Sequence, residues 1–284
     1  MIRIIQRVVI VLTVLAAALM LAAFVRTMGG SDNNGPEITM DQDSITVGID
    51  CTDEDLLAGI TATDAKDGDV TDSLVVEELS NFIETGRRMA TIAAFDQDNN
   101  VTKVTREIVY SDYTSPRFSL TEPLRFAMNG DEDITSVFQV QDCLDGDLSG
   151  EVVITSDYYY DYSTAGDYTI TFRVSNSAGD VVELPLTVEI YDPSENSSVP
   201  KVELSEYLIY VETGSQVDPL SYVTGVTEGG TSWEMGESGN PYETDNIEVT
   251  NPVDTSEAGV YEIGYTIPTG EGYEPVIRLV VIVE

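Results

Sequence analysis

The residues best suited to chemistry in this chain are aspartates that recur in one pattern at two places. The stretch from Asp64 to Thr71 reads Asp-Ala-Lys-Asp-Gly-Asp-Val-Thr, and 78 residues later Asp142 to Ser149 reads Asp-Cys-Leu-Asp-Gly-Asp-Leu-Ser. Calcium takes about six to eight oxygen ligands, mostly carboxylates and carbonyls, and glycine permits the tight turn that gathers them. One interpretation is a pair of calcium sites built from Asp64, Asp67, Asp69, Asp142, Asp145 and Asp147.

The same pattern is also ordinary turn chemistry. Aspartate side chains accept hydrogen bonds from nearby backbone N–H groups, and glycine adopts a positive φ without steric cost. Under this alternative the loops hold the chain in shape and need no cofactor. A neighbouring stretch, Asp96 to Asn100, imitates the start of an EF-hand loop, but Val101 stands where glycine is required and no helices flank it. We interpret that stretch as a polar turn.

A third stretch carries residues suited to contact with a partner. Residues 226–245 are rich in glycine and serine and hold the only tryptophan, Trp233, together with Met235 and Tyr242. Exposed loops often carry binding residues, and large aromatic side chains contribute strongly to interfaces. We expect these three side chains to contact a ligand. The alternative is that Trp233 folds back over the edge of the protein's own core.

Catalysis finds no support in the sequence. The chain contains no histidine, which removes the usual general base and the commonest zinc ligand. Neither a G-x-S-x-G motif nor a phosphate-binding loop occurs. Neighbouring carboxylates carry little information in a chain with 51 acidic residues. We expect a protein that is not an enzyme.

The elements that must position these residues are strands. After residue 36 apolar residues alternate with polar ones, which indicates strands with one buried face. The clearest case is a predicted hairpin in which residues 166–174 and 182–190 alternate around a turn at 176–180. The same hairpin recurs at residues 259–267 and 277–283, and less clearly at 86–94 and 104–110.

This recurrence predicts three domains, at residues 36–113, 114–194 and 199–284, each of a size suited to a seven-stranded sandwich. Short connectors with proline near each junction favour a semi-extended rod over a loose chain. Residues 29–35 form a flexible tether before the first domain.

The N-terminal residues 1–28 predict a membrane anchor. Residues 8–25 are apolar except for Thr13, and Arg3, Arg7 and Arg26 flank them. The apolar run approaches the length of about 20 residues that a spanning helix needs, and the flanking charges predict a cytoplasmic N-terminus with the domains outside. The alternative is a cleaved signal peptide, whose apolar core is usually about 7–15 residues long. Either interpretation implies export.

The exported part is strongly acidic. Without the three flanking arginines, 10 basic residues remain against 51 acidic ones, a formal charge of −41. Such a charge repels nucleic acid and anionic lipid and attracts cations or basic partners. Solubility of a surface protein is the simpler explanation. The two cysteines, Cys51 and Cys143, do not occupy equivalent repeat positions, so we expect two free thiols rather than one disulfide.

The acidic motifs and the hairpin motifs together resemble a known family. The repeated Asp-x-x-Asp-Gly-Asp motif, followed by Ala165-Gly-Asp-Tyr-Thr-Ile-Thr-Phe and Asn176-Ser-Ala-Gly, is similar to bacterial immunoglobulin-like surface repeats. These are the Big- and HYR-like modules found in tandem on bacterial envelope proteins and appended to some insecticidal crystal toxins. The resemblance is strong for residues 114–192, fair for 36–113 and partial for 199–284, where the acidic motif is missing.

The resemblance implies an all-β chain of three tandem immunoglobulin-like β-sandwiches, which here follow an N-terminal transmembrane helix, on the cell surface. We expect a single-pass protein of the bacterial cell membrane whose domains serve adhesion or recognition of an extracellular protein or glycan. Two alternatives stay open. One is a structural spacer or assembly factor of the cell envelope, acting in polysaccharide or protein export. The other is a calcium-stiffened module without a ligand of its own.

Overall fold

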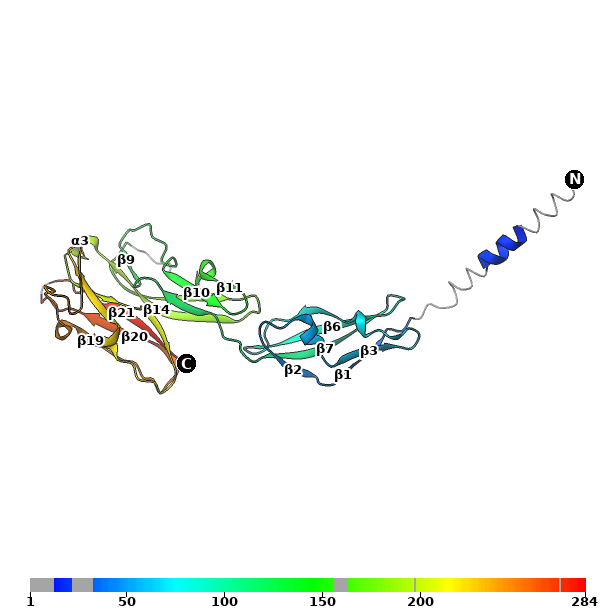
Figure 1. Cartoon of the computed structure of the whole chain (residues 1–284). Coiled ribbons are helices and arrows are strands. Elements are labelled where there is room, and N and C mark those ends of the chain that lie inside the picture. Colours follow the sequence, from blue (N-terminus) through cyan, green and yellow to red (C-terminus); the bar gives the residue numbers. More distant parts are fainter. Residues whose placement is uncertain (1–12, 22–32, 156–162, 197, 271) are drawn as a thin grey trace. The chain divides into compact units, whose positions relative to one another are not determined.

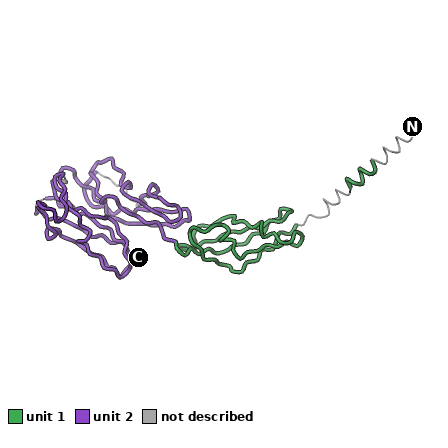
Figure 2. The backbone as a smooth tube through the Cα atoms, viewed as in Figure 1, with its two compact units in different colours: residues 1–112 green, residues 113–284 purple. Residues whose placement is uncertain are grey.

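The structure is a computed structural model that describes residues 13–21, 33–155, 163–196, 198–270 and 272–284. The described part is all-β apart from short helices, as the sequence predicted (Figure 1). Residues 13–21 are helical, α2 spans Asp53–Leu57 and α3 spans Pro193–Asn196. The chain divides into two compact units, residues 1–112 and 113–284 (Figure 2).

The first unit contains two sheets. The three-stranded sheet has the order β1-β3-β4, and the four-stranded sheet has the order β2-β7-β6-β5. Their strands are β1 (Glu37–Met40), β2 (Ser44–Val47), β3 (Ile60–Asp64), β4 (Gly68–Asp69), β5 (Val75–Leu79), β6 (Arg87–Phe95) and β7 (Val101–Tyr110). All pairings are antiparallel except that β2 runs parallel to β7.

The first half of the second unit repeats this arrangement. A three-stranded sheet of order β11-β10-β8 accompanies a four-stranded sheet of order β12-β13-β14-β9. Their strands are β8 (Arg117–Leu120), β9 (Arg125–Ala127), β10 (Phe138–Asp142), β11 (Gly146–Asp147), β12 (Val153–Ile154), β13 (Gly166–Ser175) and β14 (Val181–Tyr191). Here β9 runs parallel to β14, as β2 does to β7.

The arrangement occurs a third time in the rest of the second unit. The sheets have the orders β15-β17-β18 and β16-β21-β20-β19, and β16 runs parallel to β21. Their strands are β15 (Lys201–Leu204), β16 (Leu208–Val211), β17 (Val223–Glu228), β18 (Thr231–Glu234), β19 (Glu248–Thr250), β20 (Gly259–Thr266) and β21 (Ile277–Val283). The three predicted hairpins are thus the pairs β6–β7, β13–β14 and β20–β21. We call residues 36–113, 114–194 and 199–284 the first, second and third segments; these boundaries stay predictions.

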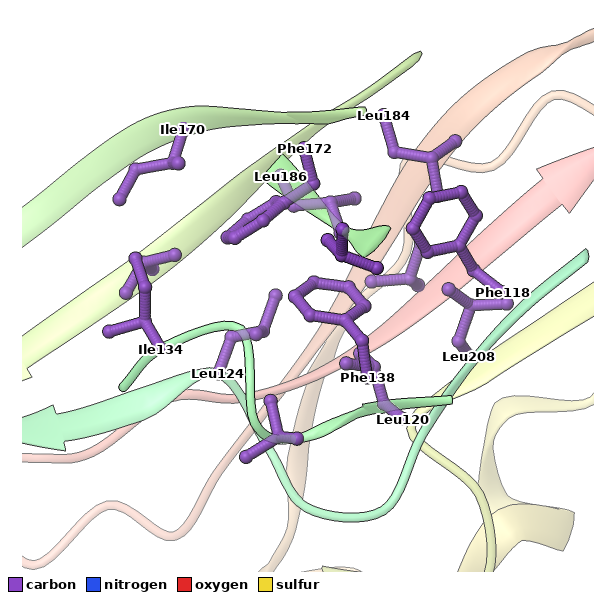
Figure 3. Close-up of a cluster of buried hydrophobic side chains, with 14 of the residues drawn as sticks. Phe118, Leu120, Leu124, Ile134, Phe138, Ile170, Phe172, Leu184, Leu186 and Leu208 are labelled. Atoms are coloured by element: carbon purple, nitrogen blue, oxygen red, sulfur yellow. The ribbon is translucent and has the colours of Figure 1, made fainter. Parts of the chain in front are cut away.

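The alternation of the sequence explains which faces are buried. In β13 the side chains of Ile170, Phe172 and Val174 are each at most 1% exposed, while the residues between them are more accessible. Phe172 stacks at a tilt on Phe138, which meets Phe118 edge-on with ring centroids 5.7 Å apart. Figure 3 shows these rings among the leucine and isoleucine side chains of the cluster. A half-buried sheet face of this kind supplies most of the apolar burial that stabilises a segment.

Strand β21 departs from the alternation because both of its faces are buried. Leu279, Val281 and Val283 pack into the core of the third segment. Val280 and Ile282, on the opposite face, join the core cluster of the second segment. Leu208 of β16 belongs to the same cluster (Figure 3). A strand that is covered on both faces reads as an uninterrupted apolar run, which residues 279–283 are.

The second and third segments therefore pack on one another within the second unit, and the predicted rod is wrong for this pair. The expectation rested on the prolines of the connector at residues 192–200. Connector stiffness does not decide the arrangement here, because Val280 and Ile282 would otherwise expose apolar surface to water. Burial of such side chains contributes roughly 1.5–3 kcal/mol each, which exceeds the bias of a short linker.

Charged side chains complete this contact between the segments. Arg125 and Glu189 of the second segment form an ion pair at 2.6 Å in which both side chains are 7% exposed, and Tyr273 of the third segment bonds to both. Arg278 reaches Asp167 at 2.5 Å. Arg117 reaches Glu284 at 2.6 Å.

Half of the predicted membrane span at residues 8–25 lies outside the described residues, as does the tether at 29–35 up to residue 32. Within the described part, no helix is long and apolar enough to cross a membrane. Cys51 and Cys143 are both free thiols, as predicted.

Candidate functional site

In the first segment the acidic stretch forms the turn between β3 and β4. The Oδ1 atom of Asp64 accepts hydrogen bonds from the N–H groups of Lys66 and Asp67, both at 2.8 Å. Gly68 has a φ of 80°, a conformation that favours glycine. Beyond it, Asp69 accepts from the N–H of Thr71 at 3.0 Å. The bonds from the N–H groups of Asp67 and Lys66 hold the pKa of Asp64 below the usual value, because they favour the charged carboxylate. Hydrogen bonds from the hydroxyl and the N–H of Thr71 lower the pKa of Asp69 for the same reason.

The second segment repeats this turn between β10 and β11. Asp142 accepts from the N–H groups of Leu144 and Asp145, both at 2.9 Å. Asp147 accepts from the hydroxyl and the N–H of Ser149, which lowers its pKa. The local geometry is thus the turn chemistry that was the alternative to calcium binding.

The middle aspartate of each turn accepts hydrogen bonds from a residue far away in the sequence, which the spacing of the motif alone does not reveal. Asp67 accepts from the N–H of Gln97 at 2.9 Å. Asp145 accepts from both the N–H and the hydroxyl of Ser177, at 2.6 and 2.7 Å. Gln97 and Ser177 each lie in the turn of the long hairpin of the same segment. Each acidic loop therefore ties the three-stranded sheet to the hairpin turn of the four-stranded sheet.

The polar turn predicted at residues 96–100 is the hairpin turn that Asp67 holds. Asn100 donates its N–H to the side chain of Asp96, and Asn99 has a φ of 66°. The equivalent turn in the second segment is held more completely. Asn176 donates to both Asp142 and Tyr113, and Tyr113 in turn donates to Asp180. Burial, together with the bond to Asp180, raises the pKa of Tyr113.

These contacts bear on the calcium interpretation. Both oxygens of Asp142 and both oxygens of Asp145 already accept hydrogen bonds from protein donors. In the part of the chain that the structure describes, no group of three or more histidine, cysteine, aspartate or glutamate side chains is placed to hold a metal ion. The carboxylates of Asp142 and Asp145 are therefore engaged in the bonds of the turn and of the hairpin. Calcium binding stays a prediction.

The third segment has a longer hairpin where the other two have the acidic turn. Strands β17 and β18 pair from Gly225–Glu234 to Glu228–Thr231, and Gly229 and Gly230 form the turn with φ values of 57° and 81°. From the sequence we interpreted residues 226–245 as an exposed loop, and that interpretation is wrong for their first half, which contains residues of β17 and β18. Two glycines at a two-residue turn were the signal for this hairpin.

The three predicted contact residues lie together and are half-buried. Trp233 pairs with Val226, which is 0% exposed, so its side chain shares the inward face of the sheet. Its ring meets that of Tyr242 edge-on at 6.0 Å. Met235 and Tyr242 pack against the core of the third segment. Burial and a hydrogen bond to Glu228 raise the pKa of Tyr242 to about 12. Each side chain thus combines packing with a surface that remains accessible.

Sequence reasoning missed the buried polar group between the segments. Asp167 and Glu189 stand directly opposite each other on β13 and β14. Like charges in this position are unfavourable unless cations neutralise them. Arg125 neutralises Glu189, and Arg278 of the third segment neutralises Asp167. The two opposed acids in the predicted hairpin were a signal that basic partners must come from elsewhere in the chain.

One catalytic spacing does occur, Ser198-Val-Pro-Lys201, which matches S-x-x-K. On a helix these two residues would share a face. Here Pro200 stands between them and Lys201 begins strand β15, so no helix brings them together.

Comparison with known proteins gives limited similarity. No protein-family model matches the chain, and no curated protein matches it. The CBM51-2 and INT domains of ZmpB from Clostridium perfringens share 17% identity over 53% of this chain and 26% of theirs, with a TM-score of 0.22. The extracellular domain of protocadherin gamma B4 shares 13% identity over 89% of this chain and 50% of its own, with a TM-score of 0.21.

A lipoprotein from Bacteroides thetaiotaomicron shares 13% identity over 86% of this chain and 99% of its own, with a TM-score of 0.20. This chain spans about a quarter of the length of the first of these structures. With TM-scores this low, we transfer neither a fold nor a ligand from any of them. Membership of the Big- or HYR-like repeats stays a prediction.

Proposed function

We propose that this chain is a membrane-anchored surface protein whose three tandem immunoglobulin-like sandwiches serve adhesion or recognition. The observation that carries the proposal is the change in the third segment. Where the first two segments have a short acidic turn, the third has the β17–β18 hairpin with Trp233 beside Tyr242. A half-exposed tryptophan–tyrosine pair is the kind of surface that anchors a partner.

Three further observations support this proposal. The same two sheets recur in each segment, which favours tandem modules over a single catalytic domain. The second and third segments share a core cluster, so the contact surface is held on a preorganised body. The apolar run at residues 8–25, with its flanking arginines, supports the anchor and the cell-membrane location.

The test compares binding by variants of the full chain. Beads coated with the full chain are incubated with intact bacterial cells and with immobilised polysaccharides. We expect Trp233→Val to lower binding by about tenfold, because it removes the aromatic surface but keeps a strand-forming apolar residue on β18. Phe82→Val, at a half-buried aromatic residue of the first segment, is the matched control and should bind as the unmodified chain does.

Unchanged binding by Trp233→Val, with an unchanged thermal midpoint, would assign the contact to another surface. Deletion of residues 226–245 is less informative, because it would also remove Val226 from the core.

The second candidate function is a spacer or assembly factor of the cell envelope. The buried contact between the second and third segments favours it, because a spacer requires a fixed length. The two functions respond differently to two variants. A recognition protein should lose function with Trp233→Val. A spacer should tolerate that change but lose function with Val280→Asp, which separates the segments.

A further inference from the structure

The third segment has a polar hollow that lies apart from the Trp233–Tyr242 pair. Its volume is about 550 Å³, and it is lined by Ser215, Gln216, Val217, Asp218, Asn251, Val253 and Thr255. These residues come from two loops, one between β16 and β17 and the other between β19 and β20. The volume lies within the range of about 300–1,000 Å³ that is typical of small-ligand sites.

The two loops are tied together and to the end of β21, so the hollow does not depend on a ligand for its shape. Gly214 donates its N–H to the carbonyl of Thr255 at 2.7 Å. Thr213 donates both its N–H and its hydroxyl to the carbonyl of Glu284, also at 2.7 Å. Val217 and Val253 pack on the core of the segment from beneath. Preorganised walls of this kind reduce the ordering cost of binding.

The lining side chains keep both donors and acceptors available. Asn251 uses its Oδ1 atom to accept from the N–H of Val253, which leaves its amide N–H₂ group. Asp218 uses Oδ1 to accept from Leu220, which leaves Oδ2. Three other lining side chains make no hydrogen bond with any residue that the structure describes. They belong to Ser215, Gln216 and Thr255.

The charge of the hollow restricts the ligand. None of the seven lining residues is basic, and Asp218 contributes a carboxylate. Arg278, one of two basic residues in this segment, is engaged by Asp167 and Glu262. An anionic ligand would meet repulsion without a compensating cation. A ligand with many hydroxyl groups and no charge can use the mixed donors and acceptors, while its C–H faces contact Val217 and Val253.

We propose that this hollow is a binding site for a neutral oligosaccharide. Hydroxyl groups of the sugar donate to Asp218 and accept from Asn251, and Gln216, Ser215 and Thr255 can each act in either direction. The site rests on the loops around residues 215 and 253 alone, so it does not depend on the proposed adhesive function or on Trp233.

The test uses the full chain and sugars of known charge. Saturation-transfer NMR is recorded with cellotriose, maltotriose and chitotriose as neutral probes and with trigalacturonate as the anionic one. We expect at least one neutral trisaccharide to bind at millimolar concentration. We expect trigalacturonate to bind far more weakly or not at all. Gln216→Ala combined with Thr255→Val should weaken the neutral sugar by about tenfold, because two hydrogen-bonding groups are lost.

The matched control is Gln139→Ala combined with Gln97→Ala, which removes two exposed amides elsewhere and should leave binding unchanged. Thermal midpoints verify that each variant remains folded. The proposal is wrong if no neutral probe binds, if the lining variant binds as the unmodified chain does, or if trigalacturonate binds as tightly as the neutral sugars. Cell binding that persists in the lining variant, but not in Trp233→Val, would separate this site from the proposed adhesive one.

Discussion

At the scale of single residues, the acidic loops matter because their aspartates bond to residues that are distant in the sequence, and not because of their number of charges. Asp145 spans 32 positions of sequence to bind Ser177, and Asp67 spans 30 to bind Gln97. Each bond joins the two sheets of one segment at the same place. An interpretation from motif spacing alone can recognise the local turn but not this second role.

The first prediction concerns these two aspartates. Asp67→Asn with Asp145→Asn should destabilise the chain by about 1 kcal/mol per site, since a neutral amide oxygen accepts these bonds less strongly than a charged carboxylate does. The measurement is thermal unfolding in chelator, in millimolar Ca²⁺ and in NaCl of equal ionic strength. We expect the double variant to unfold at a lower temperature than the unmodified chain in all three conditions.

The same experiment decides whether calcium binds. A ligand that binds only the native state must raise its unfolding temperature. A rise of several degrees in Ca²⁺ beyond that in NaCl, absent from the double variant, would establish the loops as metal sites. The salt control is necessary because a chain of net charge −38 is stabilised by any screening cation.

The second prediction concerns a buried cation. Arg106 is 2% exposed and donates to the carbonyls of Leu56 and Ala58 at the end of α2. The equivalent positions in the other segments are Leu186 and Leu279. Opposite Arg106 on β6 stands Ala90, where the other segments have isoleucine. The small alanine leaves space for the long arginine.

We expect Arg106→Ala to cost about 3 kcal/mol, because it leaves a cavity and two carbonyls without their donor. The pair Ala90→Ile with Arg106→Leu, which copies the core of the second segment, should recover more than half of that loss. Hydrogen exchange of residues 87–110 in the full chain measures both. Equal protection in the single and paired variants would argue against the size match between the two positions.

At the scale of elements, strand β21 determines how the second unit is built. The hairpin β20–β21 repeats β13–β14 in pairing, but its outer face carries Val280 and Ile282 where a solvent-facing strand has polar residues. One strand thus contributes to two cores. The second segment contributes the complementary acids, Asp167 and Glu189, whose charges require Arg278 and Arg125.

The third prediction tests this shared strand. Val280→Asp should separate the second and third segments, because an isolated carboxylate in an apolar contact is strongly unfavourable. In calorimetry of the full chain we expect the transition of the second unit to split into two. Glu183→Asp, at an exposed ion pair with Arg173, serves as a control that leaves one transition. A single undivided transition for Val280→Asp would mean that the contact at Val280 is not what couples the unfolding of the two segments.

At the scale of the whole molecule, the dominant property is negative charge. With a formal net charge of −38 and a sequence pI of about 4.1, carboxylates repel one another throughout neutral pH. Repulsion of this kind destabilises the compact state and is reduced by salt or by protonation. Asp64, Asp69 and Asp147 respond in the opposite direction, because their lowered pKa values mean that protonation costs stability.

The fourth prediction follows from these opposing signs. A carboxylate whose pKa is lowered on folding contributes its full stability above the unfolded pKa of about 3.9 and loses it as pH falls through the folded value. Asp64, Asp69 and Asp147 belong to this class. At low salt the unfolding temperature should therefore rise as pH falls from 7 towards about 4.5 and drop below about 3.5.

Calorimetry at a series of pH values, at low and high NaCl, measures this profile. Salt should raise the unfolding temperature at pH 7 and have little effect near pH 4. Asp69→Asn with Asp147→Asn should reduce the drop in unfolding temperature below about pH 3.5. The rise in unfolding temperature between pH 7 and about 4.5 should remain. An unfolding temperature at pH 7 that does not respond to salt would contradict the dominance of charge repulsion.

The sequence was sufficient for the features that depend on neighbours along the chain. Alternation identified the inward residues of β13, β14 and β20, because successive side chains of a strand point to opposite faces. The aspartate–glycine pattern identified the turns, because Asp64 and Asp142 bond to N–H groups only two or three residues away. The hairpin at Gly229 and Gly230 carried an equally local signal, which was hidden by reading the stretch as composition alone.

What only the tertiary structure decided is where outward-facing residues go. Nothing in the local sequence indicates that Val280 and Ile282 pack on the second segment, that Asp145 reaches Ser177, or that two loops enclose the hollow beside Asn251. The physical reason is range. Turn chemistry and strand alternation act over a few residues, whereas an apolar outer face or a carboxylate acts on whatever surface the fold brings within a few ångströms of it.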